Sequence, residues 1–132
     1  MKRLGGRGAS VAHNPTSNMK LGSGLAAVRK MLSAGVNVAI GTDGTASSDN
    51  ANMFESMRLT LFVSRVQGFD VQTWLTSQET LRAATEGGAK ALGFDAKFGR
   101  LAKGYMADLA MLDLHALQFI PLNNPLNQLI HA

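Results

Sequence analysis

The sequence of 132 residues contains no cysteine, few aromatic residues and no long hydrophobic run. The absence of cysteine excludes disulfide bonds and thiolate metal ligands. Aromatic residues make up only 6% of the chain, so we expect leucine, valine, alanine and methionine to form the core. No stretch approaches the roughly 18 apolar residues that a membrane-spanning helix needs. The sequence therefore predicts no membrane partner.

The net charge is +4, but basic residues rarely lie close together. Only Lys2, Arg3 and Arg7 form a cluster, whereas a nucleic-acid-binding surface needs a basic stripe or patch. We therefore expect no nucleic-acid partner. No apolar run follows this basic start, so it does not resemble a signal peptide. With 45% hydrophobic residues, the composition predicts a soluble, cytoplasmic protein of mixed α/β structure.

The first third of the chain has the pattern of a strand, a helix and a second strand. Residues 9–13 are typical of a short strand, and apolar residues at helical spacing follow between residues 25 and 32. Gly35 suits the position just past a helix end, and residues 36–40 are rich in β-branched side chains. A strand–helix–strand unit of this length predicts a parallel strand pair with a right-handed crossover.

Further helices are expected downstream. One helix should carry an apolar side, formed by Met53, Phe54, Met57, Leu61 and Val66. Asp49 or Asn50 could cap its start, and Thr76 with Glu79 forms a capping box for the next helix.

The sequence changes character after residue 98. Residues 99–104 are typical of a turn between short strands, residues 107–114 of a strand, and residues 126–130 of a short helix at most. We therefore predict a boundary that divides the chain into residues 1–98 and residues 99–132.

Two titratable residues are expected to meet where the parallel strands end. His13 ends the first strand and Asp43 follows the second, about 30 residues later, which is close to one repeat of a βα barrel. Sites form at this edge of parallel sheets. The alternatives are a buried, hydrogen-bonded histidine and an aspartate that merely bonds its own turn between Gly41 and Gly44.

Polar residues in the loops that follow both strands could add hydrogen-bonding groups, although each could equally serve only its own loop. They are Asn14, Thr16, Ser17, Asn18, Ser47 and Ser48. A competing motif, G-x-G-x-x-A at residues 22–27, has Asp43 about 20 residues downstream, as in dinucleotide-binding proteins. Its glycines do not follow the strand directly, which weakens that alternative.

Several motifs in this order resemble the amidohydrolase superfamily. They are HNPTSNMKLGSG at residues 13–24, GTDG at residues 41–44 with Ala46 and Ser47 after it, MFESMR at residues 53–58, GGAKALG at residues 87–93 and GRLAKG at residues 99–104. The similarity is strongest to methylthioadenosine/S-adenosylhomocysteine deaminases and to s-triazine chlorohydrolases and aminohydrolases. It implies the C-terminal part of a (β/α)8 barrel, with the last two strands and the following helices, plus returning strands of a small β-sandwich.

The resemblance also implies a site. Asp43 would bind a divalent metal, with zinc favoured and iron the alternative, and would pass a proton from the attacking water to the leaving group. The reaction would hydrolyse a C–N or C–Cl bond on a small nitrogen heterocycle. His13, Asn14, Ser17, Asn18 and Ser47 would bind substrate, His13 only as a pocket or scaffolding residue, and the full-length enzyme would be a homo-oligomer.

The sequence lacks most of the metal ligands that the family uses. The other metal ligands of the family include an H-x-H pair, which is absent here, and His115 and His131 are expected to be surface or packing residues. A catalytic metal site takes at least three protein ligands. We therefore expect a fragment of a hydrolase, with an inert fragment or interaction module as the alternative.

Overall fold

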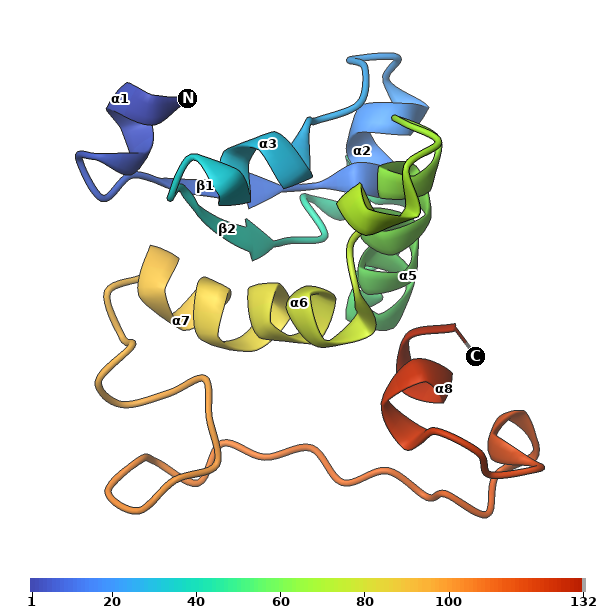
Figure 1. Cartoon of the computed structure of the whole chain (residues 1–132). Helices are drawn as coiled ribbons and strands as arrows, with labels where there is room; N and C mark the ends of the chain where they lie inside the picture. Colours follow the sequence, from blue (N-terminus) through green and yellow to red (C-terminus); the bar gives the residue numbers. More distant parts are fainter. Residues whose placement is uncertain (132) are drawn as a thin grey trace.

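The computed structural model describes residues 1–131 as two short strands among helices (Figure 1). The α-helices are α1 (Lys2–Gly5), α2 (Pro15–Lys20), α3 (Val28–Ser33), α4 (Thr45–Ser48), α5 (Met53–Arg65), α6 (Ser77–Arg82), α7 (Gly88–Ala91) and α8 (Pro125–His131). The strands are β1 (Ser10–His13) and β2 (Asn37–Ile40). Two short 3₁₀ helices are η1 (Val71–Thr73) and η3 (Leu117–Phe119), and η2 (Ala83–Gly87) is a π-helix. Within residues 1–131, every helix is too short or too polar to cross a membrane.

The strands β1 and β2 form a parallel pair, as the sequence predicts. Ser10 lies opposite Asn37 and His13 lies opposite Ile40, so both strands end at the same edge. The crossover between them includes α3, which ends in a Schellman motif: the amide of Gly35, whose φ is 75°, donates to the Leu32 carbonyl, and the next amide donates to the Met31 carbonyl.

The crossover also contains α2, which the sequence analysis did not predict. Pro15 occupies the first turn of α2, where its missing amide hydrogen costs nothing and its fixed φ favours the helix. Because α2 separates β1 from Gly22 and Gly24, these glycines do not form a strand-to-helix turn that could hold a pyrophosphate. The dinucleotide-binding alternative is therefore wrong.

The helix caps agree with the sequence in one case and differ in another. Thr76 and Glu79 make both hydrogen bonds of the capping box at the start of α6. At the start of α5, however, the cap is Asn52, whose side chain accepts from two backbone amides of the first turn. The predicted caps were wrong because Asp49 instead ends α4, in a left-handed conformation.

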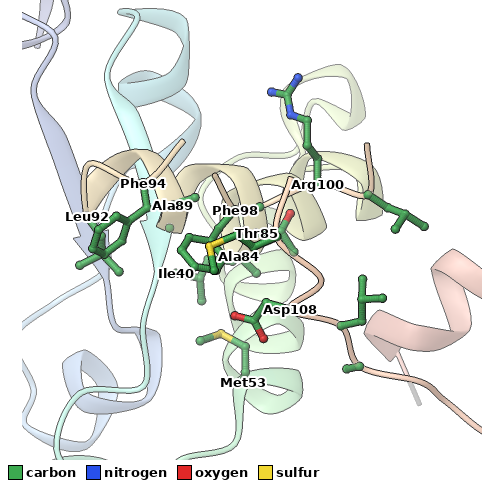
Figure 2. A pocket seen from close by; sticks show the side chains of 16 residues that line it. Ile40, Met53, Ala84, Thr85, Ala89, Leu92, Phe94, Phe98, Arg100 and Asp108 are labelled. Carbon is green, nitrogen blue, oxygen red and sulfur yellow. The ribbon is translucent and has the colours of Figure 1, made fainter. Parts of the chain in front are cut away.

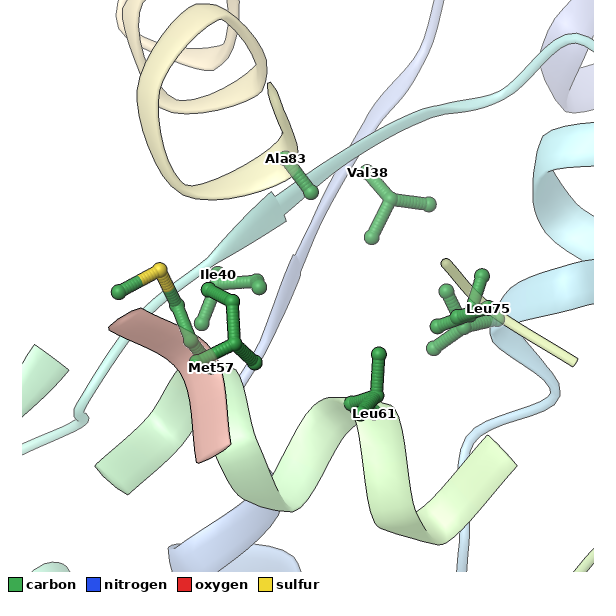
Figure 3. Close-up of a cluster of buried hydrophobic side chains, with 8 residues drawn as sticks. Val38, Ile40, Met57, Leu61, Leu75 and Ala83 are labelled. Carbon is green, nitrogen blue, oxygen red and sulfur yellow. The ribbon is translucent and has the colours of Figure 1, made fainter. Parts of the chain in front are cut away.

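The core lies between β2 and the helices that cover one side of the sheet (Figure 3). Val38 and Ile40 project from the same side of β2, and Met57 and Leu61 of α5 pack against them. The core otherwise consists of Val28, Leu75, Ala83 and Ile130. Two residues predicted on the apolar side of α5 are instead exposed: Phe54 (42% exposed) and Val66 (75% exposed).

Residues 107–114 do not form the predicted strand. This segment crosses the surface without a neighbouring strand, below α6 and α7 in Figure 1, and Met111 is 96% exposed. A strand needs a hydrogen-bonded neighbour, and the described part of the chain offers none here. The returning sandwich strands are therefore not formed, whereas the predicted short helix near the end is present as α8. The domain boundary near residue 98 stays a prediction.

Candidate functional site

The parallel register brings the ends of β1 and β2 to one edge, where the loop after β2 carries Asp43. Asp43 is exposed and has a φ of 61°, a left-handed conformation that aspartate tolerates better than most residues. The amide of Gly44 donates to its Oδ1 at 2.8 Å. The turn thus fixes the carboxylate at the open edge of the strand pair.

Two of the serines predicted to bind substrate, Ser17 and Ser47, also act on this carboxylate. The hydroxyl of Ser17 lowers the pKa of Asp43 most, followed by the Gly44 amide; burial opposes them, and the Ser47 hydroxyl lowers the pKa least. Asp43 is therefore an anion at neutral pH. Ser17 is buried in α2, so the unpredicted helix positions it. The sequence signal that could have revealed this helix is Pro15, one residue after a potential N-cap.

The neighbouring polar residues shape the same edge. Asn14 is half-buried, and its side-chain oxygen lies so close to Gly41 that a Cβ there would overlap with it. Asn18 is also half-buried, in α2. The hydroxyl of Ser48 donates to the Gly44 carbonyl at 3.2 Å and so holds the loop after Asp43.

His13 ends β1 at this edge, but its side chain is buried. Its register partner is Ile40, so its side chain lies on the helix-covered side of the sheet, and it is only 2% exposed. Burial lowers its pKa, so the ring is neutral. Neither ring nitrogen has a hydrogen-bond partner within residues 1–131. This placement matches the buried-histidine alternative, without its expected hydrogen bonds, and supports a scaffolding role.

The described residues do not fit a complete metal centre. No group of three or more histidine, aspartate or glutamate side chains lies together within residues 1–131. Asp43 is one donor, whereas a catalytic zinc site takes three from the protein. His115 is exposed beside Asp113, and His131 packs against Phe62. Both are surface or packing residues, as predicted.

Comparison with known proteins identifies the family of the chain. Residues 1–131 match the amidohydrolase family. The chain belongs to the amidohydrolase family. It is 44% identical over 126 residues to a 5-methylthioadenosine/S-adenosylhomocysteine deaminase of Acetivibrio thermocellus, and 42% identical over 132 residues to a 5'-deoxyadenosine deaminase of Methanosphaera stadtmanae. These matches cover 96% and 100% of this chain, but only 29% and 30% of the two enzymes.

Solved amidohydrolase structures agree with the fold. The chain superposes on an adenosine deaminase from Xanthomonas campestris with bound zinc at a TM-score of 0.94 and 45% identity, covering 99% of this chain and 30% of that enzyme. It also superposes on atrazine chlorohydrolase from Arthrobacter aurescens complexed with zinc, at a TM-score of 0.93 and 33% identity, with 98% and 28% covered. The fold is thus a part of an amidohydrolase barrel.

Proposed function

We propose that this chain supplies one part of a metal-dependent hydrolase that deaminates a purine nucleoside or a derivative of one. In such a reaction water adds to the ring carbon that carries the amino group, the C–N bond breaks and ammonia leaves. A carboxylate must take a proton from the water and return it to the leaving nitrogen. The chain spans 29% to 31% of the length of its curated relatives, so the activity belongs to a longer protein.

The position of the Asp43 carboxylate is the observation that supports this proposal most. Asp43 stands at the end of a parallel strand, where sites form in such folds, and its turn holds the carboxylate open to solvent. The carboxylate is exposed and its pKa lies below the ordinary value, mainly through Ser17 and the Gly44 amide, so it is ionised at neutral pH, as a proton acceptor must be. The effect of Ser17, which belongs to α2 and lies outside this turn, distinguishes Asp43 from an aspartate that bonds only its own turn.

The relatives favour deamination over dechlorination. The chain is 44% identical to the Acetivibrio thermocellus deaminase and 45% identical to the Xanthomonas campestris adenosine deaminase, but 33% identical to the atrazine chlorohydrolase. We therefore propose an adenosine derivative as the substrate. Asn14 and Asn18 are the proposed substrate contacts of this chain, while Ser17 and Ser47 orient Asp43.

We also propose Asp43 as one donor to a zinc ion. Zinc is bound in the adenosine deaminase and the atrazine chlorohydrolase on which this chain superposes, which favours zinc over iron. The remaining donors would come from outside the described residues, which supply too few on their own.

A fused enzyme tests the proposal. This chain replaces the 126 matched residues of the Acetivibrio thermocellus deaminase, and ammonia release from 5'-methylthioadenosine and S-adenosylhomocysteine is measured beside chloride release from atrazine. We expect ammonia from the purine substrates and no chloride. A folded fusion that releases chloride but no ammonia contradicts deamination, and one that releases neither contradicts the proposed function.

A further inference from the structure

Asn14 precedes α2 at the position where an asparagine side chain ordinarily caps a helix. Its side chain makes no capping hydrogen bond and is half-buried. Its main chain does serve the helix, since the Asn18 amide donates to the Asn14 carbonyl at 3.0 Å. Within residues 1–131 the carboxamide has no hydrogen-bond partner. It is therefore available for a contact outside the helix.

The Asn14 carboxamide lies over the backbone at the end of β2. The parallel ladder continues one step past the strands, because the Gly41 amide donates to the His13 carbonyl at 3.0 Å. Asn14 thus lies opposite Gly41, and its side-chain oxygen takes the place that a Cβ of Gly41 would fill. Ile40 projects into the core, so Gly41 and the Asn14 side chain share the opposite face of the sheet. The missing side chain at Gly41 gives the carboxamide its space.

The same end of α2 also contacts Asp43. The hydroxyl of Ser17, in the first turn of α2, is hydrogen-bonded to the Asp43 carboxylate. Gly41 precedes Asp43 by only two residues, and neighbouring parallel strands lie roughly 4.8 Å apart. Two separate contacts therefore bring the start of α2 to the loop after β2. The carboxamide of Asn14 and the carboxylate of Asp43 are neighbours at one edge of the sheet.

An apolar groove beside β2 is the alternative place for a ligand (Figure 2). It has a volume of about 830 Å³, and Ile40 and Met53 contribute to its mainly apolar lining. Asp108 projects into it in Figure 2. Neither Asn14 nor Asp43 lines this groove. The proposed reaction at Asp43 therefore takes place outside it, at the polar edge.

The chemistry of adenine decides which of its atoms suits a carboxamide beside Asp43. In the proposed deamination water adds across the bond between C6 and N1, so the oxygen goes to C6 and a proton to N1. A carboxamide is a neutral hydrogen-bond donor and cannot supply that proton. N7 lies on the other side of the amino group and only accepts a hydrogen bond. Asparagine pairs with this edge of adenine, its side-chain nitrogen donating to N7.

We infer that the Asn14 carboxamide determines specificity by donating from Nδ2 to N7 of the purine. The contact rests on the proposed function, which places C6 of an adenosine derivative beside Asp43. An s-triazine is a single six-membered ring and has no nitrogen equivalent to N7, so it leaves the carboxamide without a partner. A site that loses a hydrogen-bond partner rejects a ligand more strongly than one that loses an apolar contact. Asn14 thus favours a purine over a triazine.

Substrate analogues test the contact in the fused deaminase. The kcat/KM for 5'-methylthioadenosine is compared with that for its 7-deaza analogue, in which a C–H group replaces N7, and for its 3-deaza analogue. We expect Asn14→Ala to lower kcat/KM for the parent and the 3-deaza compound about tenfold, but not for the 7-deaza compound. Asn127→Ala is the matched control, since Asn127 is an exposed asparagine of α8, and it should leave all three values within about twofold.

A second variant tests the geometry of the contact. A Cβ on Gly41 would displace the Asn14 side chain, and the φ of Gly41 lies outside the left-handed region, so alanine brings no backbone strain. Gly41→Ala should therefore reduce the dependence on N7 as Asn14→Ala does. In the Asn14→Ala background it should lower kcat/KM no further, because both changes act through one side chain.

Three results overturn the contact with N7. They are an equal loss for the parent and the 7-deaza compound, which assigns Asn14 a structural role, no loss for either, and a loss that spares only the 3-deaza compound. Calorimetric binding of the same compounds needs no turnover. Binding that depends on Asn14 and N7 without ammonia release supports the contact and contradicts the proposed function. Ammonia release that is indifferent to Asn14 contradicts the contact alone, and a fusion that neither binds nor releases ammonia contradicts both.

Discussion

A buried histidine without hydrogen-bond partners makes the stability of this chain depend on pH. The pKa of His13 lies below its ordinary value of 6.5 in the folded state because burial penalises the charged ring. Below pH 6.5 the unfolded chain therefore binds a proton that the folded chain does not. The free energy of unfolding should fall as the pH is lowered, by up to about 1.4 kcal/mol per pH unit.

Urea unfolding of the chain between pH 7.5 and about pH 5 measures this effect. His13→Leu should flatten the pH dependence and cost little stability at pH 7, because it removes unpartnered buried nitrogens. His131, whose pKa is lowered by burial and by Arg65 and Arg58, contributes in the same direction, so His131→Phe should leave the His13 part in place. An unchanged slope in His13→Leu contradicts this assignment.

Glu79 is the residue whose ionisation most clearly supports the fold. Hydrogen bonds from Arg29, at 2.7 and 2.8 Å, and from Thr76 lower its pKa to about 2. Its stabilisation is complete above pH 4.5 and is lost as the pH falls toward about 2. Glu79→Gln should cost about 1 kcal/mol at pH 7, since the pair is partly exposed.

The control for this prediction is Glu86→Gln. Glu86 pairs with Arg100 and Arg82 but caps no helix, so its loss should cost less than about 0.5 kcal/mol. Chemical unfolding at pH 7 and pH 3 measures both variants. An equal cost for both at pH 7 would show that the capping box contributes nothing beyond an ordinary ion pair.

The sequence could predict the positions of some site residues, but not the contacts of others. The position of Asp43, just after a strand and between glycines, predicted its place at the sheet edge. The contact of Ser17 with Asp43 could not be predicted, because it depends on how α2 folds over that edge. The side on which His13 lies depends on its register with Ile40, which periodicity over four residues does not fix.

At the scale of elements, the helical segment from α6 through η2 to α7 packs directly on β2. A Cβ on Gly87 would overlap with the Val38 carbonyl oxygen, whereas a Cβ on Gly88 meets nothing. Gly87→Ala should therefore destabilise the fold by about 1–3 kcal/mol. Gly88→Ala should be stabilising by about 0.5–1 kcal/mol, because alanine favours the helix. Thermal unfolding of both variants tests the contact, and equal effects would exclude it.

Elements with local signals were predicted well. The parallel strand pair, the capping box of α6 and the end of α3 at Gly35 follow from periodicity and cap chemistry in short segments. The strand expected at residues 107–114 has the right composition, but a strand exists only where another backbone pairs with it. Whether residues 107–114 form a strand depends on a neighbouring strand, which the composition of this segment does not predict.

At the scale of the whole molecule, the chain is a part of an amidohydrolase barrel that carries one carboxylate of the proposed site. Motifs in a fixed order predicted the family, which the comparisons confirm. The proposed substrate and the predicted homo-oligomer of the full-length enzyme stay predictions. The central claim is that the Asp43 carboxylate takes part in the proposed reaction and does not only stabilise its own turn.

The most direct test measures ammonia release by the fused deaminase with Asp43→Asn and with Asp49→Asn. Both residues are exposed aspartates with left-handed backbones, φ 61° and 63°, so the pair controls for effects on the turn. We predict that Asp43→Asn lowers kcat by about 10²–10⁴-fold and that Asp49→Asn leaves it within about twofold. Retention of kcat by a folded Asp43→Asn fusion, or an equal loss in both variants, would contradict the claim.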